Sequence, residues 1–103
     1  MTKVHIAAEV WDDAFVGYEW YESRSQGSGG GLGADFMQTV HEALDRIKSN
    51  PLQFPVIEGS IRRALVRRFP YGIFFCLEDG DAIVLGIEDL RKGTMQWKSR
   101  PKD

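Results

Sequence analysis

The period of the apolar residues changes once along this chain, from helical to strand-like, and that change limits the folds it can adopt. Apolar side chains recur every three or four residues from about Ala8 to Arg24 and again from about Ala34 to Ser49. Pro51 ends the second segment, because proline cannot continue a helix. These spacings predict two amphipathic helices. Their core-facing side chains should include Trp11, Phe15, Phe36, Val40 and Leu44.

A run rich in glycine and serine, residues 26–33, joins the two predicted helices. Such residues hold no single conformation cheaply, so we expect a flexible connection between antiparallel helices. The run lacks the Gly-Lys-Ser/Thr ending of a phosphate-binding loop and follows a helix rather than a strand, which argues against nucleotide binding. An engineered linker would have the same composition.

Strand-like patterns occupy the remaining segments. The runs are Lys3–Ile6, Ile61–Phe69, Gly72–Leu77 and Ala82–Ile87, with a hairpin turn at residues 78–81. The order β-α-α-β-β-β predicts a single α+β domain over residues 1–103, in which a helical hairpin packs on a mainly antiparallel four-stranded sheet. Phe74 and Leu85 should be buried in that sheet.

The composition argues against several classes of protein. Cys76 is the one cysteine and lies in an apolar run, which indicates a buried thiol rather than a disulfide or a metal site. His5 and His41 have no ligand-like spacing, so we expect no metal, no cofactor and no catalytic residue. With no apolar run long enough for a membrane span and no secretory signal, we expect a cytoplasmic protein that does not contact membranes.

Charge is distributed unevenly behind the formal net charge of −2. Residues 1–60 hold 4 Lys or Arg against 9 Asp or Glu, whereas residues 61–103 hold 9 against 6. A basic second half predicts a local surface for an acidic partner, either nucleic acid or protein.

Four of the basic residues form an arginine-rich run between Arg62 and Arg68. In a strand, alternation would place Arg63, Leu65 and Arg67 on one face. Since an unpaired buried charge costs several kcal/mol, at least two of the arginines should lie at an exposed groove or pair with helix carboxylates. Salt bridges on a solvated sheet would explain the run about as well as a binding surface.

A second basic group lies in the carboxy-terminal tail, where Arg91, Lys92 and Lys98 surround Trp97. Basic side chains beside an exposed aromatic ring suit RNA or an acidic helix. A tail that is merely charged and soluble explains them equally well.

Several strings, in this order, resemble the RelE/ParE superfamily of bacterial type II toxins. They are residues 18–22 (YEWYE), 32–36 (LGADF), 50–55 (NPLQFP), 61–71 (IRRALVRRFPY) and the closing Arg91-Lys92 with Trp97. The resemblance covers nearly the whole chain and implies the fold β-α-α-β-β-β. It also implies a cognate antitoxin as partner.

The superfamily implies two activities. RelE-like members cleave mRNA on the ribosome, and ParE-like members poison DNA gyrase. Aligned by eye, the strand arginine of the nucleases falls at Gly72 and their terminal aromatic falls at Trp97, and neither can move a proton. The resemblance therefore favours a toxin that binds gyrase. The residues expected to bind the target or the antitoxin are Arg63, Arg67, Arg68, Tyr71, Arg91, Lys92 and Trp97.

Two alternatives remain at this point. One is a ribosome-dependent mRNA endonuclease, and the other is a non-toxic interaction module that kept the fold, which the acidic pair Glu88-Asp89 beside the basic tail favours. In every version we expect an acidic amphipathic helix or an added strand of the partner to cover the groove between helices and sheet near Arg63, Arg67 and the carboxy-terminal tail.

Overall fold

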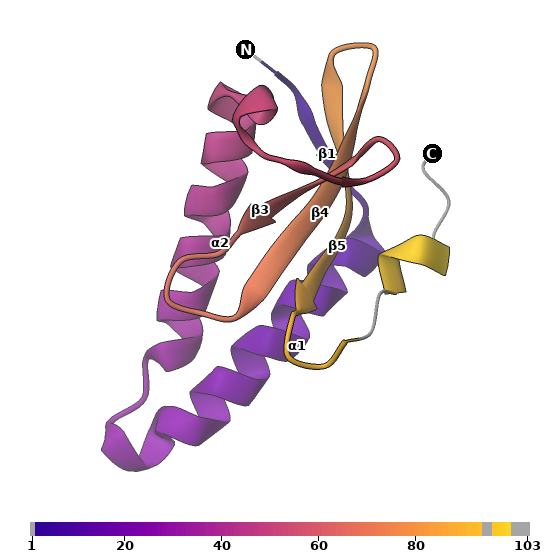
Figure 1. The fold of residues 1–103 in the computed structure, drawn as a ribbon. Coiled ribbons are helices and arrows are strands. Elements are labelled where there is room, and N and C mark those ends of the chain that lie inside the picture. The colour runs from indigo at the N-terminus through magenta and orange to yellow at the C-terminus, as the bar shows by residue number, and fades with distance from the viewer. Residues whose placement is uncertain (1, 94–95, 100–103) are drawn as a thin grey trace.

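The computed structural model describes residues 2–93 and 96–99. Along the chain, one strand is followed by two helices and then by four more strands (Figure 1). They are β1 (Val4–Ile6), α1 (Ala8–Ser25), α2 (Leu32–Ser49), β2 (Val56–Glu58), β3 (Ile61–Leu65), β4 (Tyr71–Glu78) and β5 (Asp81–Asp89), with short 3₁₀ helices at Gln26–Ser28, Pro51–Gln53 and Gln96–Ser99.

The sheet has the order β1-β5-β4-β3-β2, with β1 parallel to β5 and the other pairs antiparallel. This confirms the predicted α+β class and the helical hairpin packed on a mainly antiparallel sheet. The predicted strand number was wrong, because the described residues form a fifth strand, β2. Its three residues stand between Pro55 and Gly59 and are too few to show an alternating pattern.

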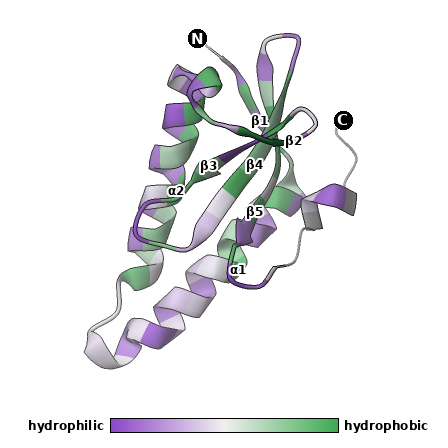
Figure 2. Ribbon diagram, in the orientation of Figure 1, coloured by the Kyte–Doolittle hydropathy of each residue, from purple (hydrophilic) through white to green (hydrophobic). Residues whose placement is uncertain are grey.

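Both helices lie on one face of the sheet, where the main core forms (Figure 1). Its aromatic cluster consists of Tyr21 of α1, Phe36 of α2, Phe69 and Tyr71, and five of the pairs among these rings have centroids 4.7–6.3 Å apart. The strands β4 and β5 are mainly hydrophobic, whereas the helices mix hydrophobic and hydrophilic residues (Figure 2). Helix packing on the sheet thus buries the apolar stripe that each helix carries.

The predicted core side chains of α2 are confirmed, since Phe36, Val40 and Leu44 are all buried. The prediction for α1 was partly wrong. Trp11 is only partly buried, and Phe15 is 55 % exposed and stacks on Tyr18 at the surface. The buried side of α1 instead carries Val10, Ala14, Gly17 and Tyr21 at helical spacing. Ala14 and Gly17 allow the helix to approach the sheet closely.

The glycine-rich connection has a defined structure, although the sequence predicts a flexible link. Glu22 of α1 reaches across it, and its carboxylate accepts hydrogen bonds from the backbone N–H groups of Gly31 (3.2 Å) and Gly33 (3.0 Å). These groups belong to the first turn of α2, which begins at Leu32 rather than Ala34. The connection therefore ends in a helix cap supplied by the neighbouring helix.

The face of the sheet turned away from the helices, here called the outer face, has a second and smaller core. Ile61, Phe74, Cys76 and Leu85 form it together with Trp97 of the carboxy-terminal 3₁₀ helix. The predicted burial of Phe74, Leu85 and Cys76 is confirmed. The expectation of an exposed aromatic ring in the tail was wrong, because Trp97 is 5 % exposed and stacks on Phe74 at 5.3 Å.

The strand predicted over Ile61–Phe69 is shorter in the structure, because β3 ends at Leu65. The chain then turns, with Arg68 in the left-handed region at φ 73°, and Val66 N–H donates to the carbonyl of Tyr71 where β4 begins. Arg67 and Arg68 therefore lie in a loop rather than on strand faces. Among the described residues, no helix is long and apolar enough to cross a membrane.

Candidate functional site

One end of the outer face carries the candidate binding surface, which we call the outer patch. It consists of Arg63, Leu65, Gly72 and Leu90. The register pairs Leu65 with Gly72 and Arg63 with Phe74. The side chains of Arg63 and Leu65 therefore face away from the helices, as Phe74 does, and not into the groove between helices and sheet that the sequence predicts. Leu65 is 51 % exposed and Leu90 is 36 % exposed. The patch therefore combines two solvent-exposed leucines with an arginine.

Gly72 lies at the centre of the outer patch and is covered by its neighbours. A Cβ atom at this position would lie 3.2 Å from Cδ2 of Leu90 and 3.3 Å from Cγ and Cδ of Arg63. The Nε atom of Arg63 is buried and has no hydrogen-bond partner in the structure, so the aliphatic part of this arginine packs on the sheet. A side chain at position 72 would displace both neighbours.

Glu88 and Trp97 cover the outer face beside the outer patch, on the side of β5. Glu88 lies opposite Gly72 in the register, and its carboxylate accepts the backbone N–H of Trp97 at 2.8 Å. Glu88 is itself only 7 % exposed. Glu88 thus fixes the carboxy-terminal 3₁₀ helix onto the sheet, and Trp97 packs in the second core rather than lying on the surface.

Asp89, the second residue of the acidic pair Glu88-Asp89, forms an ion pair with Arg91. The guanidinium donates from Nε to Oδ1 at 3.1 Å and from Nη2 to Oδ2 at 2.9 Å, a bidentate pair. These hydrogen bonds from Arg91 lower the pKa of Asp89 below its ordinary value, although burial opposes them. The Arg91 guanidinium also lies over the Trp20 ring, 5.4 Å from its centroid. Arg91 is therefore positioned by three contacts and is not a freely moving tail residue.

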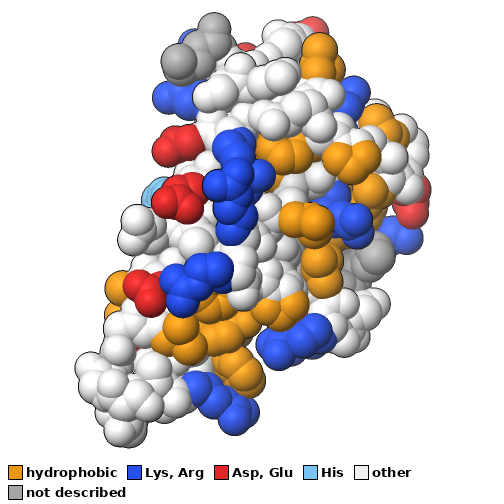
Figure 3. Space-filling model, turned by 60° about the vertical axis from the view of Figure 1, so that its left-hand side comes forward, with side chains coloured by type: hydrophobic (Ala, Val, Ile, Leu, Met, Phe, Trp, Pro, Cys, Tyr) orange, Lys and Arg blue, Asp and Glu red, His pale blue; other side chains and the backbone are white. Residues whose placement is uncertain are grey.

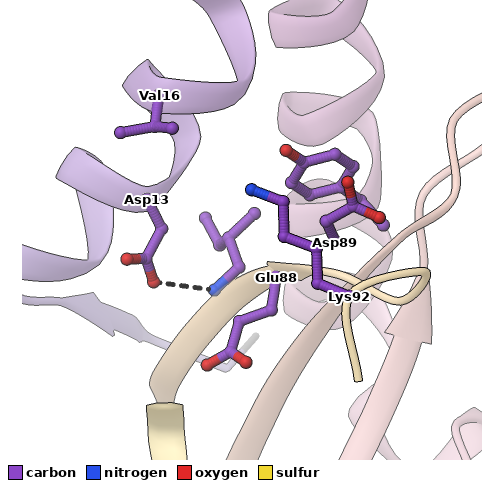
Figure 4. A pocket seen from close by; sticks show the side chains of 7 residues that line it. Asp13, Val16, Glu88, Asp89 and Lys92 are labelled. Atoms are coloured by element: carbon purple, nitrogen blue, oxygen red, sulfur yellow. Dashed lines mark hydrogen bonds between the residues drawn. The ribbon is translucent and has the colours of Figure 1, made fainter. Parts of the chain in front are cut away.

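Tyr71, another predicted binding residue, lies in the main core and is 7 % exposed. Burial and the nearby charge of Asp89 raise its pKa to about 12. It contributes to a pocket of about 190 Å³ between α1 and the end of β5 (Figure 4). In that pocket Lys92 extends between Asp13 and Asp89, while the carboxylate of Asp13 accepts the backbone N–H of Ile87.

Arg67 and Arg68 lie together on the β3–β4 loop, and both are exposed. Arg68 pairs with Asp35 of α2 at 3.7 Å, which matches the expectation that some of these arginines meet helix carboxylates. Arg67 has a neighbour that the sequence reading missed, Arg46 of α2, whose Nη2 donates to the carbonyl of Leu65 at 2.9 Å. A basic residue near the end of a helix is ordinary in sequence, so no local signal identified Arg46.

The predicted residues thus divide into three groups in space. Arg63 belongs to the outer patch, and Arg67 and Arg68 adjoin it on the loop. Tyr71, Arg91 and Lys92 gather around Asp89, where the charge of Arg91 acts on Tyr71 and that of Lys92 on Asp89. Trp97 stands apart from both groups, on the far side of Glu88.

Lys and Arg side chains lie between hydrophobic ones on the side of the molecule drawn in Figure 3. His5 pairs with Asp81 at 2.9 Å at the β4–β5 hairpin, a position outside all three groups. Among residues 2–93 and 96–99, no cluster of His, Cys, Asp and Glu could hold a metal ion.

Comparison of the sequence with the models of known protein families and with curated proteins found no match.

Proposed function

We propose that this protein is the toxin component of a bacterial type II toxin–antitoxin system of the RelE/ParE kind. It acts in the cytoplasm by binding a cellular target such as DNA gyrase, and a cognate antitoxin keeps it silent. The resemblance of the sequence strings supports this proposal. The observed order of elements, which differs from the implied order only by the short strand β2, supports it as well.

The outer patch is the observation that carries the proposal. Leu65 and Leu90 offer apolar surface, and Arg63 beside them offers a positive charge. An amphipathic segment with carboxylates would cover the leucines, and full burial of a leucine side chain contributes about 1.5–3 kcal/mol. Pairing of a partner carboxylate with Arg63 would add specificity and a faster association rate.

Two features of the outer face favour binding over RNA cleavage. Positioned acid and base groups each contribute about 10²- to 10⁴-fold to such a reaction. At Gly72 there is no side chain, and Leu90 and Arg63 cover the space that one would need. Trp97 is held in the second core by Phe74 and Glu88. The endonuclease alternative would need chemistry from other residues.

A second candidate function is a non-toxic interaction module with the same partner surface. The bidentate pair between Asp89 and Arg91 favours it, because the pair neutralises an arginine that would otherwise be available to a target. The two candidates share the antitoxin-binding surface and differ only in whether the chain arrests growth.

The test is inducible expression of the protein in bacterial cells, with and without the product of the adjoining open reading frame. We expect filamentation and DNA-damage signalling while translation continues early, and we expect the neighbouring product to suppress them. Purified protein should inhibit gyrase stoichiometrically and leave mRNA on ribosomes intact. Arg63→Glu with Leu65→Glu should weaken the complex with that product, measured by calorimetry, whereas the exposed α2 control Lys48→Glu should not.

Three outcomes would redirect the proposal. Codon-position-specific mRNA cleavage that is lost in Arg91→Ala would establish the endonuclease instead. A tight complex without any growth arrest would favour the interaction module. Unchanged affinity after the double substitution at Arg63 and Leu65 would remove the outer patch as the binding surface.

A further inference from the structure

We infer that Arg46 of α2 and Arg67 of the β3–β4 loop form a two-guanidinium site that binds a carboxylate of an acidic amphipathic protein segment. This inference rests on the proposed function, since it names the second point at which the partner of the outer patch would be recognised. Neither the resemblance nor any local pattern in the sequence pointed to Arg46.

Arg46 is held in place rather than free to move on the surface. Its Nη2 donates to the carbonyl of Leu65, the last residue of β3, at 2.9 Å. Its Nε is buried without a hydrogen-bond partner, and its guanidinium carbon lies 5.8 Å from the centroid of the Phe54 ring. Because these contacts fix the guanidinium before any ligand arrives, binding would cost little side-chain entropy.

Arg67 brings a second positive charge to the same place. Arg67 is exposed two residues after Leu65, whose carbonyl binds Arg46. Burial lowers the pKa of Arg46, the charge of Arg67 lowers it further, and the charge of Glu42 opposes both. None of the ion pairs between described residues involves Arg46 or Arg67. An anion bound between the two guanidinium groups would relieve their repulsion and form charge-assisted hydrogen bonds with both.

The surroundings favour a carboxylate on an amphipathic protein segment over a nucleic acid. The side chain of Leu65 is exposed on the outer face while its carbonyl binds Arg46, so an apolar contact and the arginine pair share one residue. Glu42 and Asp45, exposed on α2 beside Arg46, would repel the continuous charge of a phosphate backbone. A protein segment with spaced carboxylates can place one of them between the arginines and keep the others away.

Leu65 links the two sites, because its side chain belongs to the outer patch and its carbonyl accepts the hydrogen bond from Arg46. A segment that covers the outer patch would reach the arginine pair by passing the end of β3. Figure 3 shows basic and hydrophobic side chains side by side on one side of the molecule. The arginine pair would thereby fix the direction and register of the bound segment.

The probe is a short synthetic helical peptide with leucines every three or four residues and glutamates between them. Its neutral analogue carries glutamine at each glutamate, and a single-stranded RNA oligonucleotide of similar length is the third ligand. We expect the acidic peptide to bind and to shift the amide resonances of Leu65 and Arg67 and the side-chain Nε–H resonance of Arg46. Arg46→Gln and Arg67→Gln should each weaken binding about tenfold.

The control is Lys48→Gln, an equal change in charge on the same helix turn. Arg67→Gln lies in an exposed loop and tests the site even if Arg46→Gln disturbs folding. Equal effects of all three substitutions, tighter binding of the RNA, or no binding of the acidic peptide would each overturn the inference. If Arg63→Glu abolishes binding and Arg46→Gln has no effect, the arginine pair is not a binding site, and the outer patch remains the proposed binding surface. If Arg46→Gln weakens peptide binding about tenfold but the protein does not arrest growth, the arginine pair is supported and the toxin function is refuted.

Discussion

The cap that Glu22 provides for α2 leads to a prediction about stability. Its carboxylate accepts hydrogen bonds from the backbone N–H groups of Gly31 and Gly33, at the positive end of the helix dipole. Replacing Glu22 with alanine would leave those groups to water. We expect the free energy of unfolding to fall, and the connection between the helices to lose its defined structure.

The magnitude follows from two effects. Loss of a side-chain helix cap costs about 1 kcal/mol, and removal of a negative charge from a helix N-terminus costs about 0.3–1 kcal/mol. The hydrogen bonds to Gly31 are long at 3.2 Å, and this region is only partly buried, so the sum should not exceed about 2 kcal/mol. For a domain of this size, a loss of about 1–2 kcal/mol lowers Tm by roughly 4–15 °C.

Thermal and urea denaturation followed by circular dichroism would measure the effect. Glu22→Gln keeps an acceptor but removes the charge, so it should lie between the native protein and Glu22→Ala. Glu19→Ala is the matched control, because Glu19 is exposed on the same helix and, among the described residues, takes part in no hydrogen bond or ion pair. If Glu22→Ala and Glu19→Ala shift Tm equally, the cap contributes nothing and the reasoning is wrong.

Three further predictions concern packing and pH. Gly33→Ala should cost about 1–3 kcal/mol in chemical denaturation, because its Cβ would lie 2.7 Å from the backbone oxygen of Tyr18, whereas Gly27→Ala, with open space around it, should have little effect. Trp97→Ala should cost about 3–5 kcal/mol and reduce the near-ultraviolet dichroism by the contribution of the stacked Trp97 ring; an unchanged spectrum would refute its place in the second core. Burial raises the pKa of Tyr71 to about 12, so the contribution of Tyr71 to stability should be constant below pH 10 and be lost as pH rises from 10 through 12; a Tyr71→Phe variant with the same alkaline loss would contradict this.

The helices and long strands could be predicted because each carries a strong periodic pattern. The run from Phe36 to Ile47 buries every apolar position at helical spacing, and the pattern alone identified the helix. The short strand β2 could not be predicted, because it exists only through pairing with β3 and has no pattern of its own. Phe15 was misplaced because the buried side of α1 is formed by Val10, Ala14, Gly17 and Tyr21, which leaves Phe15 at the surface.

Less of the candidate site could be predicted from the sequence, because its residues come from different elements and meet only in the folded chain. Trp97 stands among basic residues in the sequence, yet it packs on Phe74, which lies far away along the chain. The basic run around Arg67 was visible, but its neighbour Arg46 comes from another element. Likewise, Glu88 and Asp89 look like charges that oppose binding until their hydrogen bonds to Trp97 and Arg91 are known.

The pairing of β1 with β5 has a consequence for synthesis of the protein. Val4 at the start of the chain pairs with Ala82 near its end, so this edge of the sheet cannot form until β5 has left the ribosome. At translation rates of about 5–20 residues per second, the helices wait for several seconds with their apolar sides uncovered. The outer patch, which needs β3, β4 and Leu90, is completed in the same late step. A partner that recognises this surface would therefore bind only after β3, β4 and Leu90 have come together.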